Sequence, residues 1–162
     1  MSGDIFLKLD GVQGESIKEG HKNEIDVETF SWGESNPTSF AAGAGGVGKV
    51  QIQDVHFTKT IDKASPNLYQ VCASGKHIPK AVFTFRKAGD KPQEYLKITL
   101  SDVMVSSISL QDHFQGGALA QESVSLAYEK ITIGYKPQKA DGSLDAEVSF
   151  AWNIKENKAE QS

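Results

Sequence analysis

The sequence predicts an all-β protein, a closed or nearly closed β-barrel of two sheets with one short helix and one long glycine-rich loop. Three observations support this fold: about seven strand-like runs at short spacing, one helix with clear end signals, and one stretch without apolar periodicity. The 162 residues suffice for one core and are too few for two domains of ordinary size. We therefore expect a single domain over residues 1–156 and a flexible, charged tail over residues 157–162.

The first two strand candidates alternate between apolar and polar side chains. Ile5, Leu7 and Leu9 alternate in this way and precede an Asp-Gly turn dipeptide. In residues 25–32 the apolar side chains change from one face of the strand to the other midway. Such a change suits a curved or closed sheet better than a flat one.

Five further strand candidates cover residues 49–60, 80–87, 94–109, 121–135 and 147–154. In the fourth of these, the apolar positions change parity at Glu129 and Lys130, which predicts a bulge there. The last candidate places four apolar side chains on one face: Val148, Phe150, Trp152 and Ile154. These runs supply most of the predicted barrel.

A single helix is predicted over Ser65–Ser74. Ser65 is the expected N-cap, Pro66 occupies the first helical position, and Gly75 follows where a C-terminal cap belongs. An apolar stripe at helical spacing consists of Leu68, Val71 and Cys72. The place of Cys72 on this stripe favours a buried small side chain over a reactive thiol.

Residues 36–48 form the predicted glycine-rich loop, which is rich in Ser, Ala and Gly and contains Phe40. Long loops in compact domains are often functional or disordered. Residues 43–49 (GAGGVGK) match the spacing of phosphate-binding loops, which rely on a following helix to hold the phosphate. Here Val50 replaces the Ser or Thr that binds magnesium, and a strand pattern follows. A flexible contact loop is therefore favoured over a phosphate site.

Three other groups of residues suggest a metal site or an acid–base pair, but their spacing or surroundings do not support one. Residues 141–145 resemble the start of a calcium loop, but Ala146 and Trp152 occupy the positions that require Gly and Glu. Asp26 and Glu28 share a strand face, as an acid–base pair would, although such carboxylates are more often simply exposed. Four histidines lie too far apart for a short metal motif: His21, His56, His77 and His113. We predict no enzyme, no cofactor and no metal site.

The composition limits the classes of partner. Lys and Arg total 17 against 21 Asp and Glu, so the formal charge of −4 lacks the basic footprint of a general nucleic-acid binder. No apolar run approaches the roughly 18 residues needed to span a membrane. The amino terminus lacks the features of a secretory leader, and the single cysteine suits a reducing cytosol. We expect a protein made in the cytoplasm, with neither nucleic acid nor membrane as partner.

Seven blocks of sequence carry a resemblance to a known family. They are FSWG at 30–33, FTKTIDKASPNL at 57–68, SGKH at 74–77, FRKAG at 85–89, EYLKITL at 94–100, YKPQKADG at 135–142 and WNI at 152–154. In order and spacing they resemble the Hcp family, the haemolysin-coregulated proteins that form the tube of the bacterial type VI secretion system. The resemblance covers nearly the whole chain and is weakest at residues 111–120 and after Ile154.

The resemblance implies a β-barrel subunit that assembles as a homohexameric ring, with rings stacking into a tube. It also implies the partners of that tube: a tip spike protein, a contractile sheath with its baseplate, and small effectors carried inside the ring. Family members are exported without a cleaved signal. A monomeric ligand-binding β-barrel is the alternative that the residues alone leave open.

The resemblance also assigns candidate site residues. It places the residue corresponding to Ser31 on the inner wall of the ring, and Thr29 shares its strand face. These two small polar residues are the predicted effector-binding site, with a polar patch at the barrel edge as the alternative. The glycine-rich loop is the predicted ring-stacking contact, with a loop that contacts nothing as the alternative. Its named residues are Phe40, Gly43, Gly45, Gly46 and Gly48.

Overall fold

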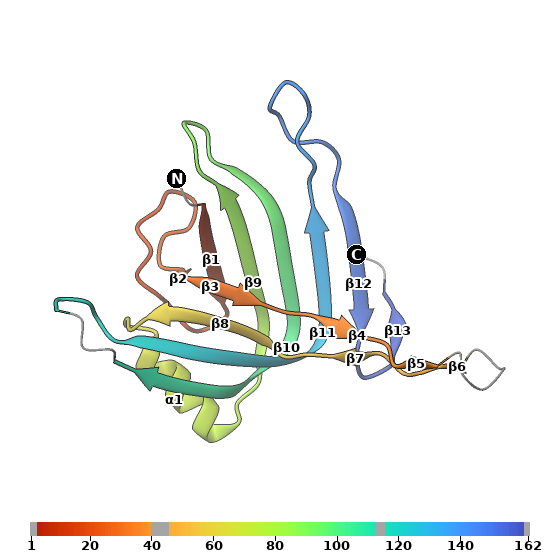
Figure 1. Ribbon diagram of the computed structural model, residues 1–162. Coiled ribbons are helices and arrows are strands. Elements are labelled where there is room, and N and C mark those ends of the chain that lie inside the picture. Colours follow the sequence, from red (N-terminus) through yellow and green to blue (C-terminus); the bar gives the residue numbers. More distant parts are fainter. Residues whose placement is uncertain (1–2, 40–45, 113–115, 161–162) are drawn as a thin grey trace.

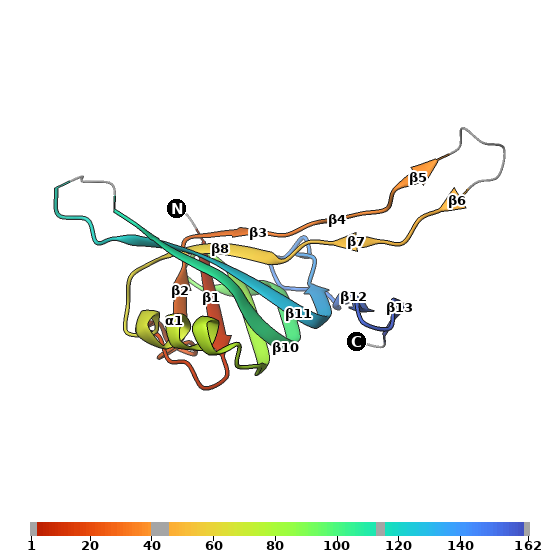
Figure 2. The same ribbon diagram turned by 90° about the horizontal axis from the view of Figure 1, so that it is seen from below.

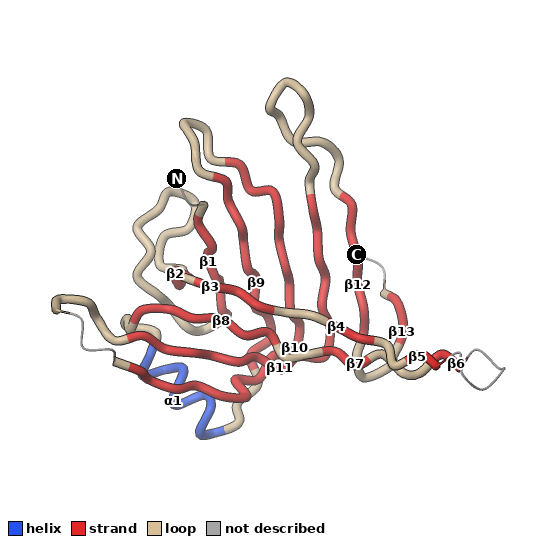
Figure 3. Tube along the Cα trace, viewed as in Figure 1, coloured by secondary structure: helices blue, strands red, loops and turns tan. Residues whose placement is uncertain are grey.

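The computed structural model describes residues 3–39, 46–112 and 116–160 of the chain. Within these ranges the elements are β1 (Asp4–Leu9), β2 (Ile25–Val27), β3 (Thr29–Ser31), β4 (Glu34–Ser35), β5 (Thr38–Ser39), β6 (Gly46–Val47), β7 (Gln51–Ile52), β8 (Val55–Thr60), α1 (Ser65–Ser74), β9 (Ile78–Lys87), β10 (Gln93–Gln111), β11 (Gln121–Tyr135), β12 (Val148–Asn153) and β13 (Lys158–Ala159). The prediction of a mostly β fold with one short helix is confirmed (Figures 1 and 3). In these ranges no helix has the length and apolar character needed to cross a membrane.

One antiparallel sheet contains nine of the strands. Its main path runs β13-β12-β11-β10-β9-β1-β2, while β8 pairs with β11 and β3 pairs with β8. The long strands β10 and β11 bend partway along their length, so each contributes to two differently oriented parts of the sheet (Figure 1). The first half of β11 pairs with β8, and its second half pairs with β12. The fold therefore places β3, β8 and the adjoining halves of β10 and β11 in one wall.

Glu28 separates two strands that belong to different parts of the sheet. Strand β2 pairs with β1, and β3 pairs with β8, so the two neighbouring segments of chain join different parts of the sheet. Glu28 separates them and donates its backbone N–H to Thr58 O at 2.8 Å. The strand pairings of the described residues do not close the sheet into a barrel, and the closed barrel is therefore not confirmed.

The bend in the long strands lies near the predicted bulge but has a different origin. Tyr128 and Ile131 are both buried, so the inward parity of β11 does change between them. Glu129 and Asp102 lie between two paired positions of the ladder but are not themselves paired. Asp102 has a positive φ of 52°. The register shift itself lies in β10, between Val105 and Ser107. The prediction of an extra residue in β11 was wrong, because the extra residue lies on the partner strand.

Aromatic and aliphatic side chains fill the space between the two parts of the sheet. Phe83 meets Phe30 edge to face at 5.0 Å and Phe57 at 5.5 Å between ring centroids. Phe57 and Phe83 are essentially inaccessible to solvent. Leu68 of α1 is also fully buried, and α1 packs against β10. Burial of this apolar surface supplies the main driving force for the fold.

The helix has the predicted bounds but a different N-cap. Gly75 ends it in the left-handed conformation, φ 67°, and donates its N–H to Cys72 O, as predicted. At the other end Ala64 is the N-cap and Ser65 is the first helical residue, so the predicted Ser65 cap was wrong. The Ser65 hydroxyl instead hydrogen-bonds to Glu122 of β11. The Ser65 hydroxyl therefore bonds to a residue distant in sequence and does not cap the helix.

The described residues of the predicted glycine-rich loop include two short paired strands. Strand β4 pairs with β7 and β5 pairs with β6, and we call residues 34–52 the arm. Figure 2 shows the arm projecting away from the body of the molecule. At Gly48 a Cβ atom would lie 2.4 Å from the Pro37 carbonyl oxygen, so this close approach requires glycine. Among the predicted stacking residues, Phe40, Gly43 and Gly45 lie outside the described residues.

Candidate functional site

A polar surface covers the outer side of the wall built by β3, β8, β10 and β11. Alternate residues of a strand point to the same side, so every second residue of each strand contributes to this surface. We call it the hydroxyl face, and its members are Thr29, Ser31, His56, Thr58, Thr60, Ser107, Ser109, Gln111, Gln121, Ser123 and Ser125. It contains both residues of the predicted effector site, Thr29 and Ser31, and both are exposed.

The register of the strands aligns these side chains in rows. One row runs Ser31, His56, Ser125 and Ser107, and the next runs Thr29, Thr58, Ser123 and Ser109. Residues directly opposite each other on neighbouring strands lie close enough to interact. The rows therefore form a continuous lattice of small hydrogen-bonding groups across four strands.

Two hydrogen bonds join neighbouring strands within the hydroxyl face. The hydroxyl oxygens of Thr29 and Thr58 are 2.6 Å apart. His56 Nδ1 lies 2.6 Å from the hydroxyl oxygen of Ser125. Thr29 and His56 are exposed, so these two side chains are open to further partners. The surface can therefore exchange hydrogen bonds with water or with a bound protein.

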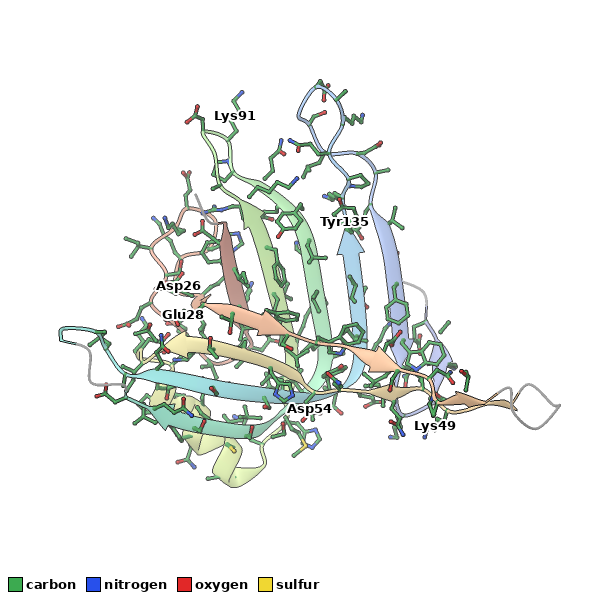
Figure 4. All side chains as sticks on the ribbon, in the orientation of Figure 1. Asp26, Glu28, Lys49, Asp54, Lys91 and Tyr135 are labelled. Carbon is green, nitrogen blue, oxygen red and sulfur yellow. The ribbon has the colours of Figure 1, made fainter. Side chains whose placement is uncertain are left out.

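Carboxylates stand at the two ends of β8, beside the hydroxyl face (Figure 4). Glu28 accepts hydrogen bonds from Thr60 and from Gln121, the latter at 2.9 Å. At the other end Asp54 accepts a hydrogen bond from Ser106 at 2.7 Å. The centre of the face is thus free of carboxylates, while its borders are acidic.

The His56–Ser125 contact resembles the base–nucleophile contact of an acyl-transfer enzyme, but its surroundings differ. Such enzymes need backbone N–H groups or side-chain donors aimed at a developing oxyanion. Strand β8 is flanked by β3 and β11, so its backbone groups are committed to ladders on both sides. Within the described ranges, no three His, Cys, Asp or Glu residues cluster as a metal site would require. The geometry favours many weak hydrogen bonds over a reaction centre.

A buried ion pair lies directly behind the hydroxyl face. Lys59 of β8 and Glu122 of β11 are opposite each other in the ladder, and both are 0% exposed. Lys59 Nζ donates to Glu122 Oε1 at 2.7 Å, to Asp62 Oδ1 at 2.8 Å and to Ser65 Oγ at 3.0 Å. Burial acts to raise the pKa of Glu122, but the hydrogen bonds from Lys59 and Ser65 and the charge of Lys59 outweigh it, and the pKa is lowered.

Sequence reasoning missed this ion pair, although a signal was present. Lys59 occupies an inward position of its strand, between the buried Phe57 and the chain leading to α1, and Glu122 is in step with the buried Val124. A charged residue at an inward position of an alternating strand needs a partner. Two inward charged residues of opposite sign on different strands therefore predict a buried ion pair between them.

A second polar network holds the root of the arm. Trp32 Nε1–H donates to the Tyr128 hydroxyl, which donates to Gln53 O at 2.7 Å. Gln53 in turn donates its N–H to Gly33 O at 3.1 Å. Burial raises the pKa of Tyr128, so its hydroxyl stays protonated and keeps donating. These bonds connect the residues that flank the two ends of the arm, Trp32 and Gln53, to Tyr128 of β11.

Strands β11 and β12 of the large sheet expose apolar side chains. Tyr135, Val148 and Phe150 are 45%, 66% and 37% exposed. Tyr135 is opposite Val148, and Ile133 is opposite Phe150, so these side chains form an apolar strip across β11 and β12. A groove of about 330 Å³ lies beside the strip, between β12 and the arm, and Phe150 and Trp152 line it. Figure 4 shows Tyr135 at the end of this strip.

The remaining sequence motifs have ordinary structural surroundings. Residue Lys49 is followed by β7, so no helix completes a phosphate-binding loop there. Asp141 accepts hydrogen bonds from the N–H and hydroxyl of Ser143 within a turn. His21 contacts Glu24 and Glu94, while His77 contacts Asp102, and neither lies with His56. Asp26 and Glu28 are both exposed, and Cys72 is partly buried.

Comparisons with known proteins agree with this architecture. Residues 6–135 match the family described as "Type VI secretion system effector, Hcp". The chain is 47% identical to Protein hcp1 of Pseudomonas aeruginosa over 97% of this chain and 98% of that protein. The crystal structure of Hcp1 from Salmonella typhimurium matches 99% of this chain and 100% of its own, with TM-score 0.82 and 38% identity. A structure described as a type six secretion system protein matches 98% of this chain and 100% of its own, with TM-score 0.91 and 30% identity.

Proposed function

The chain belongs to the Hcp family of the type VI secretion system, and on that basis we propose that it is a subunit of the inner tube that also carries effectors. Six copies form a ring, rings stack head to tail, and sheath contraction propels the tube with its spike from the baseplate. The subunit is made in the cytoplasm and leaves the cell through this machinery. The hydroxyl face, a four-strand surface of small polar side chains, is the observation that carries the effector role.

The hydroxyl face suits the wall of a passage that must hold different proteins. Small hydroxyl groups can donate or accept hydrogen bonds and present little apolar area for tight, specific docking. A single contact of this kind is weak, but repetition around a ring supplies avidity. Thr29 and Ser31 are two members of this larger effector-binding surface.

The apolar strip supports the ring contact. Exposed apolar side chains that touch one another commonly mark protein–protein interfaces. A ring needs a heterologous contact that closes after a fixed number of copies, and stacking needs a second contact that repeats along the axis. We assign the apolar strip of β11 and β12 to the first contact and the arm to the second. Gly46 and Gly48 belong to the arm, and the network at Trp32 and Tyr128 fixes its root.

Multi-angle light scattering with negative-stain imaging tests the assembly. We expect six-subunit rings with a central hole at tens of micromolar protein. A strict monomer would contradict the tube role, and a monomer that retains a small molecule in native mass spectrometry would support the ligand-binding alternative.

Deleting residues 43–46 should leave single rings intact and block stacking and secretion. Normal secretion by this deletion variant would refute the stacking role of the arm.

The effector role is tested by Ser31→Gln, which places a longer side chain on the hydroxyl face. We expect intact rings and reduced amounts of the small proteins that copurify with the assembly, measured by quantitative mass spectrometry. Ser143→Gln, in the loop between β11 and β12, is the matched control and should change nothing. Equal retention by both variants would remove Ser31 from the effector site.

A further inference from the structure

His56 differs chemically from the rest of the hydroxyl face. Among the eleven members of the face it is the one ionisable side chain, since the others are Ser, Thr and Gln. It is exposed, and the register places it directly opposite Ser31 on one side and Ser125 on the other. The predicted effector residue Ser31 therefore has an imidazole as its neighbour across the strands.

The imidazole is held in a defined orientation. Its Nδ1 atom lies 2.6 Å from the Ser125 hydroxyl oxygen, and Ser125 is nearly buried. Within the described part of the chain, no hydrogen bond to Nε2 accompanies this contact. A ring that is fixed through one nitrogen presents the other to a ligand with little loss of side-chain entropy. Nε2 is therefore a prearranged hydrogen-bonding atom on the face.

The hydrogen bond to Ser125 determines which nitrogen is open to an outside partner. When the Ser125 hydroxyl donates to Nδ1, the neutral ring carries its proton on Nε2, and a charged ring carries a proton on both nitrogens. Glu28 and Asp54 make both borders of the face acidic, and each is already bonded to hydroxyl or amide donors of the protein itself. The printed hydrogen bonds of both carboxylates go to Thr60, Gln121 and Ser106, which leaves the imidazole for a partner from outside.

We propose that His56 is the specificity-determining residue of the hydroxyl face and that it selects effector surfaces that present a carboxylate to Nε2–H. This inference rests on the proposed effector role and deepens it. The hydroxyl rows bind polar surface with little discrimination, whereas a charge-assisted hydrogen bond from a fixed imidazole distinguishes an acid from its amide. In a ring every subunit presents the same group, so a modest preference at one site is multiplied.

Matched peptides test the charge preference on the intact assembly. The probes are three acetylated and amidated peptides of identical sequence except for a central Asp, Asn or Lys, titrated into protein with isotope-labelled histidine. We expect the Asp peptide to shift the His56 ring signals and to bind about three- to tenfold more tightly than the Asn peptide, with the Lys peptide weakest. His56→Gln should abolish the difference between Asp and Asn while leaving ring assembly unchanged. His77→Gln, an exposed histidine away from the face, is the matched control and should preserve the difference.

The outcomes separate this inference from the proposed function. If the Asp and Asn peptides bind equally, or if His56→Gln keeps the preference, His56 does not determine specificity, although the tube and effector roles stand. If no peptide binds and Ser31→Gln retains its copurifying proteins, the effector role fails and the inference fails with it. A preference for the Lys peptide would show that the acidic borders, and not His56, control binding.

Discussion

Lys59 and Glu122 face the core from β8 and β11, while the residues beside them on the same two strands face outward and belong to the hydroxyl face. The inner side therefore holds full charges that are 0% exposed, and the outer side holds neutral hydroxyl groups that meet solvent. This distribution is the reverse of the usual one, in which charges are exposed. The inner pair bonds the two strands within the core, whereas the outer side is open to solvent and to other molecules.

The largest expected effect comes from breaking the inner pair. Lys59→Met leaves Glu122 buried without its cation, and such a loss costs about 3–5 kcal/mol of unfolding free energy. Urea unfolding monitored by circular dichroism measures it. Ser123→Ala, on the outer side of the same strand as Glu122, should change stability by no more than about 0.5 kcal/mol.

The double variant Lys59→Met with Glu122→Leu sharpens the same comparison. Replacing both partners of a buried ion pair by apolar residues is often neutral or stabilising. We expect the double variant to recover most of the stability lost by Lys59→Met. A double variant as unstable as the single one would show that Asp62 or Ser65, and not the unpaired Glu122, causes the loss.

Acid should weaken the inner side selectively. The Glu122 pKa is lowered in the folded protein relative to its ordinary value of 4.5, so its ionised form contributes stability above that value. This contribution is lost as the pH falls through the folded-state pKa. The stability difference between the native chain and Glu122→Gln should therefore shrink on acidification below about pH 4.5. Asp26, whose pKa burial raises, should show the opposite slope in Asp26→Asn, and equal slopes in both variants would contradict the assignment.

A buried neutral hydroxyl should give an intermediate effect. Tyr128→Phe removes the group that accepts from Trp32 and donates to Gln53, and leaves both without that partner. The expected loss is about 1–3 kcal/mol, measured by thermal or urea unfolding. Tyr135→Phe, on the exposed apolar strip, is the control and should be nearly neutral. Equal effects of the two substitutions would show that the network at the arm root adds no stability.

Local signals in the sequence were sufficient for the helix and for the long strand β11. Ser65–Ser74 and Gln121–Tyr135 have the predicted bounds, because periodicity and end signals are properties of neighbouring residues. The Ser65 cap was wrong because a partner 57 positions away in the sequence competes for its hydroxyl. The paired strands of the arm were missed because strands of two residues are too short to show a period.

The candidate site could be predicted only in part. The outward positions of each strand read as polar one strand at a time, and the family resemblance singled out Ser31. What the sequence alone does not show is the register that places Ser31 beside His56 and Ser125. Pairing of distant strands depends on the packing of the whole core, so the hydroxyl face emerges only when four strands are aligned.

The smallest expected effect on stability lies on the outer side. Thr29→Val keeps the shape of the side chain and removes its hydrogen bond with Thr58, and because the site is exposed we expect a change of at most about 0.5 kcal/mol. The same substitution should reduce effector retention, since it replaces one hydroxyl of the face by a methyl group. A loss of more than about 1.5 kcal/mol would mean that the outer hydroxyls hold the strands together, as the inner pair does. The division between a structural inner side and a binding outer side would then fail, because both sides of the ladder would serve the fold.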